Sequence, residues 1–518
     1  MIVQIKAKLK GGMKAESAVM IRQCAILVCN VLFLLCITFV LIQVFFHNNS
    51  YDYNKFLLLA IGGIVLFVLE MAYRLVAPRK ESVERYFPFV LGGYLLVMFI
   101  LEVTFGIRLR FTPVFDMSAV YDGAIEWMET GAIENYREYF HYFPNNIGLL
   151  TFLRVFFSLG KSLGITDYFL IGVILGASSL TIMMFSLFMV CRIQLGVEYA
   201  ILAMMLTAFC FPLYFSAAAF YSDVMSMAAP VLYYLLYLYS EDMTSRKKRF
   251  RIYVGMALVA GIGMEIKFTV LIMVIAVMIE MILKANVKNI ISIAVIHVVV
   301  IAMVLGIVNS VFYPELLDKE QARIMNTPVY HWIMMGARGD GRYNSEDYEF
   351  SRSFSDPEVR NEAIKEEIRK RYSEMGLSGY MDFLKHKTVV SLGDGTYAIS
   401  DFLNNEPVNR NVLHDFILYE SPEYGNYRTL CQGVFILIYM LMFAAGVGNL
   451  MKYRRNKKWV LPERDSDKVA PLLAFVGLWM FLMMWESSGR YFSNYISVML
   501  LCAVWGIACI KNSMKICR

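Results

Sequence analysis

The sequence has little charge and little histidine for a chain of its length. Only 18% of its 518 residues are charged, whereas 58% are hydrophobic, and histidine occurs six times. A soluble protein of this size carries more charge. The glycine-rich stretch 336–342 matches neither a Walker loop nor a Rossmann pattern, so it gives no sign of a nucleotide site.

Cysteine is also scarce where it would matter most. None of the nine cysteines falls in the large polar segment 313–428, which excludes a disulfide framework or a cysteine metal site there. His331 stands alone beside Trp332, and His141 lies at no ligand spacing from another histidine. We therefore predict no metal-ligand set.

Long apolar runs predict an all-α polytopic membrane protein with about twelve transmembrane helices. An even number places both ends of the chain on one side of the membrane. The run 19–46 is too long for a cleaved signal peptide, and 143–160 is expected to be a re-entrant or interfacial helix. The expected spans lie near 19–46, 55–77, 87–106, 168–191, 198–216, 224–240, 252–265, 268–283, 288–312, 430–450, 470–485 and 490–511.

The basic residues indicate which side is cytoplasmic. They gather in the N-terminal tail, at 74–85, 246–251, 284–288 and 452–468, and at the C-terminus. This is the positive-inside pattern, so the net charge of +6 is explained by membrane lipids as partners, and no nucleic acid is expected. We expect a multi-pass protein of a bacterial plasma membrane.

This topology divides the chain into four parts. An N-terminal pair of helices (1–86) precedes a transmembrane core (87–312) that contains a first outer loop, 107–167. A small α-rich extracytoplasmic domain (313–429) follows, with helical charge alternation over 356–374. C-terminal transmembrane helices (430–518) complete the chain. Long ordered loops of this kind often carry function.

Five ionisable residues fall at the ends of the predicted spans or between them. In this topology all five share the extracytoplasmic surface, although they are far apart in sequence. Ionisable groups there are costly unless they pair or face water, so their shared location predicts a functional site. The five residues are Asp116, Asp223, Lys267, Glu486 and Arg490.

Each of the five also has a purely structural interpretation. Asp116 and Asp223 could cap the helices that follow them, and Lys267 could extend its ammonium group to the membrane surface. Glu486 and Arg490 have the spacing of an ion pair along one helix. In the functional interpretation, Asp116 is a general base, and the cations hold a phosphate.

Short motifs resemble those of bacterial GT-C superfamily glycosyltransferases, relatives of the protein O-mannosyltransferases and of lipid A aminoarabinose transferase. The resemblance covers most of the chain from about residue 87 onward, with the motifs in the expected order. One departure is the single aspartate at position 116, followed by Met117, where the O-mannosyltransferases carry adjacent acidic residues. The motifs are FDMSAVYDGA (115–124), YFHYFPNN (139–146), FYSD (220–223), GIGMEIK (261–267), GDGT (393–396) and WESSGRY (485–491).

The resemblance implies a GT-C-like fold and transfer of a single sugar, with inversion, from a polyprenyl-phosphate carrier to an acceptor on the outer face. The acceptor is a glycan, a glycolipid or a protein. No cofactor is required because the sugar arrives already activated, although the carboxylates are compatible with a divalent cation. The implied catalytic residues are Asp116 and, as the alternative base, Asp122; those for the donor phosphate are Lys267, Arg490 and Lys387; and those of the pocket are Asp223, Glu486, Tyr221, His141, Asn145 and Asp394.

Two other classes of function were compared with this one. A transporter or flippase for lipid-linked sugar or polysaccharide would show charges deep in its spans and broken helices in two matching halves. This chain instead has its charges near one face and no evident halves. A polysaccharide polymerase or ligase shares the donor chemistry and stays an alternative.

The predicted topology can be tested by cysteine-accessibility labelling. Single cysteines at positions 116, 267 and 490, in a variant without native cysteines, should all react with a membrane-impermeant maleimide added from outside. Labelling of position 267 or 490 from the inner side only, with 116 labelled from outside, would rule out a shared site.

Overall fold

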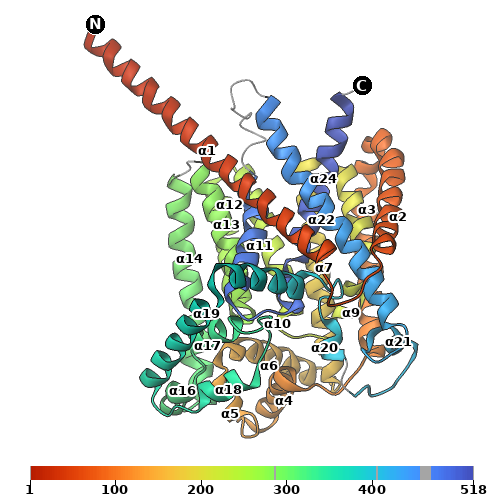
Figure 1. The fold of residues 1–518 in the computed structure, drawn as a ribbon, viewed down its shortest axis with the longest axis vertical. Coiled ribbons are helices and arrows are strands. Elements are labelled where there is room, and N and C mark those ends of the chain that lie inside the picture. Colours follow the sequence, from red (N-terminus) through yellow and green to blue (C-terminus); the bar gives the residue numbers. More distant parts are fainter. Residues whose placement is uncertain (1, 285–286, 404–405, 456–467, 517–518) are drawn as a thin grey trace.

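The computed structural model describes residues 2–284, 287–403, 406–455 and 468–516. Within these ranges the protein is all-α, apart from one isolated β-bridge between Phe111 and Pro407. Figure 1 shows the two ends of the chain at the same end of the molecule, while the helices labelled α4 to α6 and α16 to α18 gather at the opposite end. The predicted all-α class is confirmed.

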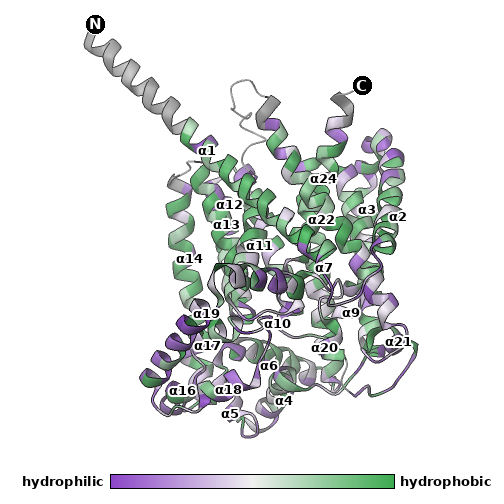
Figure 2. Ribbon diagram, viewed as in Figure 1, coloured by the Kyte–Doolittle hydropathy of each residue, from purple (hydrophilic) through white to green (hydrophobic). Residues whose placement is uncertain are grey.

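Within the described ranges, six helical stretches are long and apolar enough to cross a membrane: 20–46, 55–108, 168–195, 289–316, 424–452 and 489–513. They belong to α1 (Ile2–Phe46), α2 (Lys55–Val76) with α3 (Lys80–Arg108), α7 (Tyr168–Leu195), α14 (Val287–Ile307), α22 (Tyr424–Arg455) and α24 (Ile496–Ile516). Figure 2 shows their apolar residues in green. The protein is a multi-pass membrane protein, and the expected number of crossings, about twelve, stays a prediction.

In the part of the chain that the structure describes, three shorter apolar helices accompany these stretches: α8 (Val197–Ala208), 268–283 with its main part α13 (Leu271–Leu283), and α23 (Ala470–Met484). The core is formed by the C-terminal helices, since 89% of the most apolar part of 489–513 is buried inside the protein, against 11% for 289–316. α24 packs against α22 and α7, and α2 packs on α22. The apolar residues left outside, such as Phe67 and Val298, suit contact with lipid.

Two of the predicted spans are interrupted. The expected span 198–216 ends as α8 at Ala208 and resumes only as the short α9 (Pro212–Ser216). The expected span 224–240 is preceded by a separate turn, α10 (Ser222–Met225), before α11 (Ala228–Asp242). The backbone between α8 and α11 is thus irregular inside the protein, which is tolerated where protein covers it.

The first outer loop folds into α4 (Phe115–Thr130), α5 (Arg137–Tyr142), the 3-10 turn η2 (Pro144–Asn146) and α6 (Ile147–Ser162). α6 covers most of the run 143–160, for which a re-entrant or interfacial helix was expected, and it packs against α4. The motif YFHYFPNN lies across α5 and η2. Its proline starts η2, where a missing N–H costs nothing.

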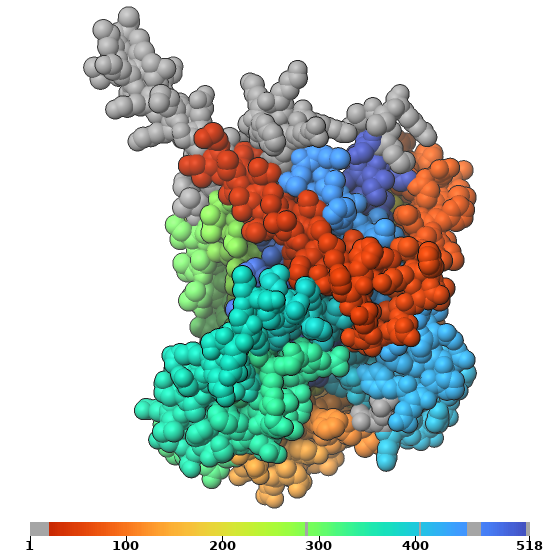
Figure 3. Space-filling model, in the orientation of Figure 1, coloured from red at the N-terminus to blue at the C-terminus, as the bar shows by residue number. Residues whose placement is uncertain are grey.

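The second outer segment consists of α15 (Tyr313–Leu316), α16 (Lys319–Met325), α17 (Val329–Gly336), α18 (Ser345–Arg352), α19 (Pro357–Leu392), α20 (Ile399–Leu403) and α21 (Val412–Ile417). Asp356 caps α19 by accepting from the backbone N–H groups of Glu358 and Val359, so the helix predicted over 356–374 is present. Figure 3 shows this segment in teal beside the first loop in orange.

The helix α19 bends at Gly376, whose φ of 57° lies in the left-handed region. Beyond the bend, its second half packs against α1, α23 and the 3-10 turn η5 (Gly489–Tyr495). The polar segment therefore reaches back to the transmembrane helices at its C-terminal half. The proposed domain boundaries stay predictions.

Candidate functional site

The five predicted charged residues all lie where helices start, end or break. Asp116 is in the first turn of α4, Asp223 is in α10, and Lys267 is the extended residue between α12 (Arg246–Ile266) and the 3-10 turn η3 (Phe268–Val270). Glu486 lies in the link after α23, and Arg490 is in η5. Such positions free side chains from regular helix packing.

Asp223 and Lys267 form an ion pair inside the protein. The Lys267 ammonium donates a hydrogen bond to Asp223 Oδ1, and the two side chains are 12% and 3% exposed, respectively. The pair joins α10 to the α12–η3 turn. The predicted roles of Asp223 as a helix cap and of Lys267 as a surface-seeking lysine are therefore wrong, because a buried charge is satisfied best by an opposite charge.

Asp116 and Arg490 form a second, looser pair. Arg490 Nη2 lies 4.0 Å from Asp116 Oδ2, and the side chains are 22% and 41% exposed. Asp116 was also expected as a possible N-cap, but the cap position of α4 is Val114, which leaves the Asp116 carboxylate free for other contacts. Because this pair is long and open to solvent, both groups remain available to a ligand.

A chain of hydrogen bonds fixes the Asp116 carboxylate. The Tyr139 hydroxyl donates to Asp116 Oδ1 at 2.9 Å, and Asn146 Nδ2 donates to the Tyr139 oxygen at 2.6 Å. The Tyr221 hydroxyl donates to Asn146 Oδ1 at 3.1 Å. This series of hydrogen bonds connects α5 and η2 of the first outer loop to Tyr221, just before α10. It thus links Asp116 to the segment that carries Asp223 through neutral side chains.

Aromatic rings surround the guanidinium of Arg490. Its centre lies 5.2 Å from the Tyr491 ring, 5.4 Å from the Phe402 ring and 5.7 Å from the Tyr221 ring. Lys267 Nζ also lies 4.8 Å from the Tyr491 ring. Ring faces attract cations, so Tyr491 holds the two cations near each other.

Glu486 completes the cluster. Burial raises the pKa of its carboxyl group, and the positive charge of Arg490 opposes that shift. The expected ion pair along one helix is wrong, because residues 485–488 are not helical. Asp223 Oδ2 has no hydrogen-bond partner within the described residues, which leaves one buried carboxylate oxygen for a ligand hydroxyl or water.

The second outer segment holds the link that carries Glu486. Lys387 Nζ donates to the carbonyl oxygens of Gly336 and Trp485, at 2.7 and 2.6 Å, and Ser487 N donates to Gly341 O at 2.7 Å. A Cβ atom on Gly336 would lie 2.5 Å from the Trp485 backbone, so this contact requires glycine. Lys387 thus positions the link, and its role in phosphate binding stays a prediction.

Three other predicted residues lie apart from the charged cluster. Asp122 accepts a hydrogen bond from the Tyr136 hydroxyl at 3.1 Å, and burial raises the pKa of its carboxyl group. His141 is buried, and its Nε2 accepts from the backbone N–H of Asp318 at 3.2 Å. Asp394 is buried near Arg428 and accepts from the backbone N–H of Thr396 at 2.9 Å.

The sequence arguments missed two groups at the centre of the site, Tyr139 and Asn146, and selected their neighbours His141 and Asn145 instead. Asn145 only donates a long 3.4 Å bond to Asn146 Oδ1. The motif YFHYFPNN contains all four residues, but the turn at Pro144 decides which of them face Asp116. Tyr491 ends the motif WESSGRY but was not singled out, and Phe402 gave no sequence signal beyond being aromatic.

No group of three or more His, Cys, Asp and Glu side chains suited to a metal ion occurs among the described residues. The carboxylates of the cluster are spread over three separate segments and interleaved with cations. The need for a divalent cation is therefore a question for the activity assay.

The fold and this site define an integral multi-pass membrane protein with a polar cluster at one end of its helices. The chain belongs to a family of conserved hypothetical integral membrane proteins, whose pattern matches residues 18–509. No curated protein matches the sequence.

Among solved structures, the protein is similar to the archaeal oligosaccharyltransferase AglB from Archaeoglobus fulgidus, determined in complex with an inhibitory peptide and a dolichol-phosphate. The similarity covers 84% of this chain and 51% of AglB, with 12% identity and a TM-score of 0.36. This chain thus spans about half the length of AglB.

The buried Lys387 amine predicts a pH-dependent stability. Burial lowers the pKa of Lys387 to about 7, whereas an unfolded lysine keeps a pKa of about 10.4. Between these pH values the unfolded chain binds more protons, so the free energy of unfolding should rise with pH. The thermal midpoint of the detergent-purified protein, measured at pH 7 and pH 9, should rise less in Lys387→Met than in the wild type.

Lys385→Met is the matched control, because Lys385 is exposed and pairs only with Asp382. It should keep the wild-type difference between the two pH values. Identical pH profiles for Lys387→Met and the wild type would show that the amine is not held as described.

Proposed function

We propose that the cluster of Asp116, Asp223, Lys267, Glu486 and Arg490 transfers one sugar from a polyprenyl-phosphate carrier to a hydroxyl group of an acceptor. The observation that supports this most directly is the open pair of Asp116 and Arg490, with 4.0 Å between carboxylate and guanidinium. The pair thus brings a general base, Asp116, next to a phosphate-binding group, Arg490, although the two residues are far apart in sequence.

Arg490 is the group best placed to hold the donor phosphate. Its planar guanidinium can donate two parallel hydrogen bonds to phosphate oxygens, and its loose 4.0 Å pair with Asp116 leaves it within reach of a ligand. Lys267 also lies near the Tyr491 ring but is already paired with Asp223. We therefore expect Lys267 to stabilise the phosphate by its positive charge at a distance, and not by a direct hydrogen bond.

Asp116 is the proposed general base. Tyr139 occupies one carboxylate oxygen, Oδ1, while Oδ2 faces the side of Arg490. In the reaction, the acceptor oxygen forms a bond to the anomeric carbon as the bond from that carbon to the phosphate oxygen breaks. The acceptor proton moves to Asp116, and the carrier leaves as polyprenyl phosphate, with its developing charge stabilised by Arg490.

The proposal also covers the partners and the orientation. The prenyl tail of the donor would lie among the membrane lipids that surround the apolar helices, and the acceptor would be a surface glycan, a glycolipid or a protein. We place the cluster on the outer face of a bacterial plasma membrane, since the basic clusters of the sequence predict the other face to be cytoplasmic.

Removing the base should abolish turnover and leave the protein folded. With purified protein in detergent, a panel of radiolabelled polyprenyl-phosphate sugars and acceptors extracted from a bacterial envelope, Asp116→Asn should lower kcat by about a hundredfold or more. Asp122→Asn is the matched control on the same helix and should stay near wild type. Each assay is run with and without EDTA to test for a divalent cation.

The products separate the competing functions. Addition of one sugar supports the proposal, chain growth indicates a polymerase, and movement of the lipid in vesicles without a new bond indicates a transporter. Full activity of both Asp116→Asn and Asp122→Asn would remove the general-base role.

The donor side predicts a different kinetic effect. Arg490→Gln should raise the KM for the lipid donor by about tenfold or more and also lower kcat, because it removes a charged hydrogen bond to phosphate and the stabilisation of the leaving group. Arg323→Gln, at an exposed arginine of α16, should change neither constant. A change confined to the KM of the acceptor in Arg490→Gln would contradict the assignment.

A further inference from the structure

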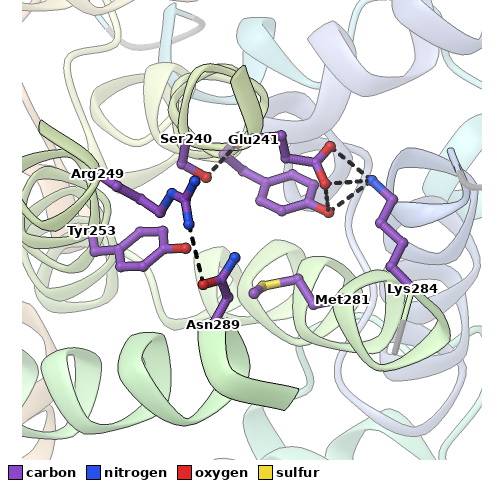
Figure 4. Close-up of a pocket in the computed structure, with 8 residues that line it drawn as sticks. Ser240, Glu241, Arg249, Tyr253, Met281, Lys284 and Asn289 are labelled. Atoms are coloured by element: carbon purple, nitrogen blue, oxygen red, sulfur yellow. Dashed lines mark hydrogen bonds and ion pairs between the residues drawn. The ribbon is translucent and has the colours of Figure 1, made fainter. Parts of the chain in front are cut away.

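A cavity of about 300 Å³ lies at the other end of α12, away from the charged cluster. It is formed by the C-terminal ends of α11 and α13 and the N-terminal parts of α12 and α14, and Figure 4 shows the side chains that line it. One water takes up about 30 Å³ of the liquid, so the cavity has room for a small polar group with some water. Its lining residues are Tyr237, Ser240, Glu241, Arg249, Tyr253, Met281, Lys284 and Asn289.

The position of this cavity is set by the length of α12. Arg249 near the start of the helix and Lys267 at its end are separated by about 27 Å, at about 1.5 Å per residue. The apolar core of a bilayer is about 30 Å thick. When the charged cluster lies at one membrane surface, the cavity therefore lies at the headgroup level of the other.

Lys284 does not offer a free charge to this cavity. Its ammonium lies 2.8 Å from a Glu241 carboxylate oxygen and 3.0 Å from a Glu280 oxygen, and it donates to the Tyr237 hydroxyl at 2.9 Å. The other Glu280 oxygen accepts from the backbone N–H groups of Val469 and Ala470. One ammonium thus faces two carboxylates, so Lys284 is fully engaged by Glu241 and Glu280.

Arg249 differs from Lys284. No ion pair involves it among the residues that the structure describes, and its buried Nε has no hydrogen-bond partner there. Nη1 donates a long 3.5 Å bond to Asn289 Oδ1, and Nη2 donates to the carbonyl oxygen of Met243. A half-buried guanidinium with an unused donor, beside a cavity, is suited to an anion with several acceptor oxygens.

The surroundings would attract such an anion. Arg246, Lys247, Lys248 and Arg251 lie on the same helix as Arg249 and are exposed. Basic clusters at a membrane surface draw anionic headgroups toward them. These exposed residues increase the local concentration of anions, whereas Arg249 and the cavity supply a defined binding place.

We propose that this cavity binds a phosphate ester, with the Arg249 guanidinium and the Asn289 side chain as its ligands. A phospholipid headgroup and a soluble phosphate share this chemistry. The site is independent of sugar transfer at the other end of α12, because none of its residues belongs to that cluster.

Binding can be measured with radiolabelled dioleoylphosphatidylglycerol retained by immobilised, detergent-purified protein. We expect one saturable site whose Kd rises about tenfold or more in Arg249→Ala and less than about twofold in Arg251→Ala, since only Arg249 loses a defined charged hydrogen bond. Arg251 is the matched control: it removes the same charge from the same helix, but from an exposed position.

Competition identifies the source of the phosphate. Displacement by unlabelled phosphatidylglycerol alone supports a lipid headgroup, and displacement by inorganic phosphate as well supports a site that also takes soluble phosphate. Displacement by dioleoylglycerol, which has no phosphate, overturns the proposal. Equal effects of Arg249→Ala and Arg251→Ala overturn it too, since they indicate diffuse attraction to the basic surface.

A second variant covers the case in which Arg249→Ala does not fold. Asn289→Leu keeps every charge and removes the polar side chain opposite Arg249. A monodisperse Asn289→Leu protein with a Kd raised at least about threefold supports the site, and one with the wild-type Kd overturns it.

Discussion

The buried pair of Asp223 and Lys267 is the contact on which the outer site depends. Either charge alone, at that depth, would be uncompensated, and losing one partner of such a pair costs roughly 3–5 kcal/mol. Together they tie the irregular backbone before α11 to the turn between α12 and η3. The Tyr491 ring contacts both Lys267 and Arg490. The buried pair of Asp223 and Lys267 therefore helps to position Arg490.

The two ion pairs of the site have different environments and hence different uses. The inner pair, Asp223 and Lys267, is almost fully buried, so it is a fixed part of the structure. The outer pair is 4.0 Å long, with the Asp116 side chain 41% exposed, and a pair in contact with water contributes little energy. A ligand can therefore separate Asp116 from Arg490 at low cost, while the inner pair keeps both in place.

Much of this arrangement could be predicted from the sequence, for reasons visible in single residues. Lys267 interrupts an apolar run too long for one span, so a turn was expected there, and α12 does end at Ile266. What could not be predicted was the partner of each charge. Local patterns suggested caps for Asp116 and Asp223 and a helical pair for Glu486 and Arg490. Instead, Asp223 pairs with Lys267, 44 positions away, and Asp116 lies near Arg490, far along the chain.

The same limit explains the choice of His141 and Asn145 over Tyr139 and Asn146. All four stand in one motif, and the direction of each side chain is set by the turn at Pro144 and by what packs against it. Lys387 is a similar case: a lysine in a polar segment suggests a surface cation, yet α19 bends at Gly376 and carries Lys387 inside, to two backbone carbonyl groups. The direction of these side chains depends on tertiary packing, which cannot be predicted from a local sequence pattern.

The helix α12 connects the two polar regions of the protein and explains why they are so far apart. It has cations near its first turn and at its end, with an apolar stretch between them that no charge interrupts until Glu265. A helix of this composition lies stably in a membrane only when both ends reach polar surroundings. At one end, Lys267 contacts Asp223 and Tyr491. At the other end, Arg249 contacts Asn289 and lines the cavity. The length of α12 thus sets the distance between the two polar sites across the membrane.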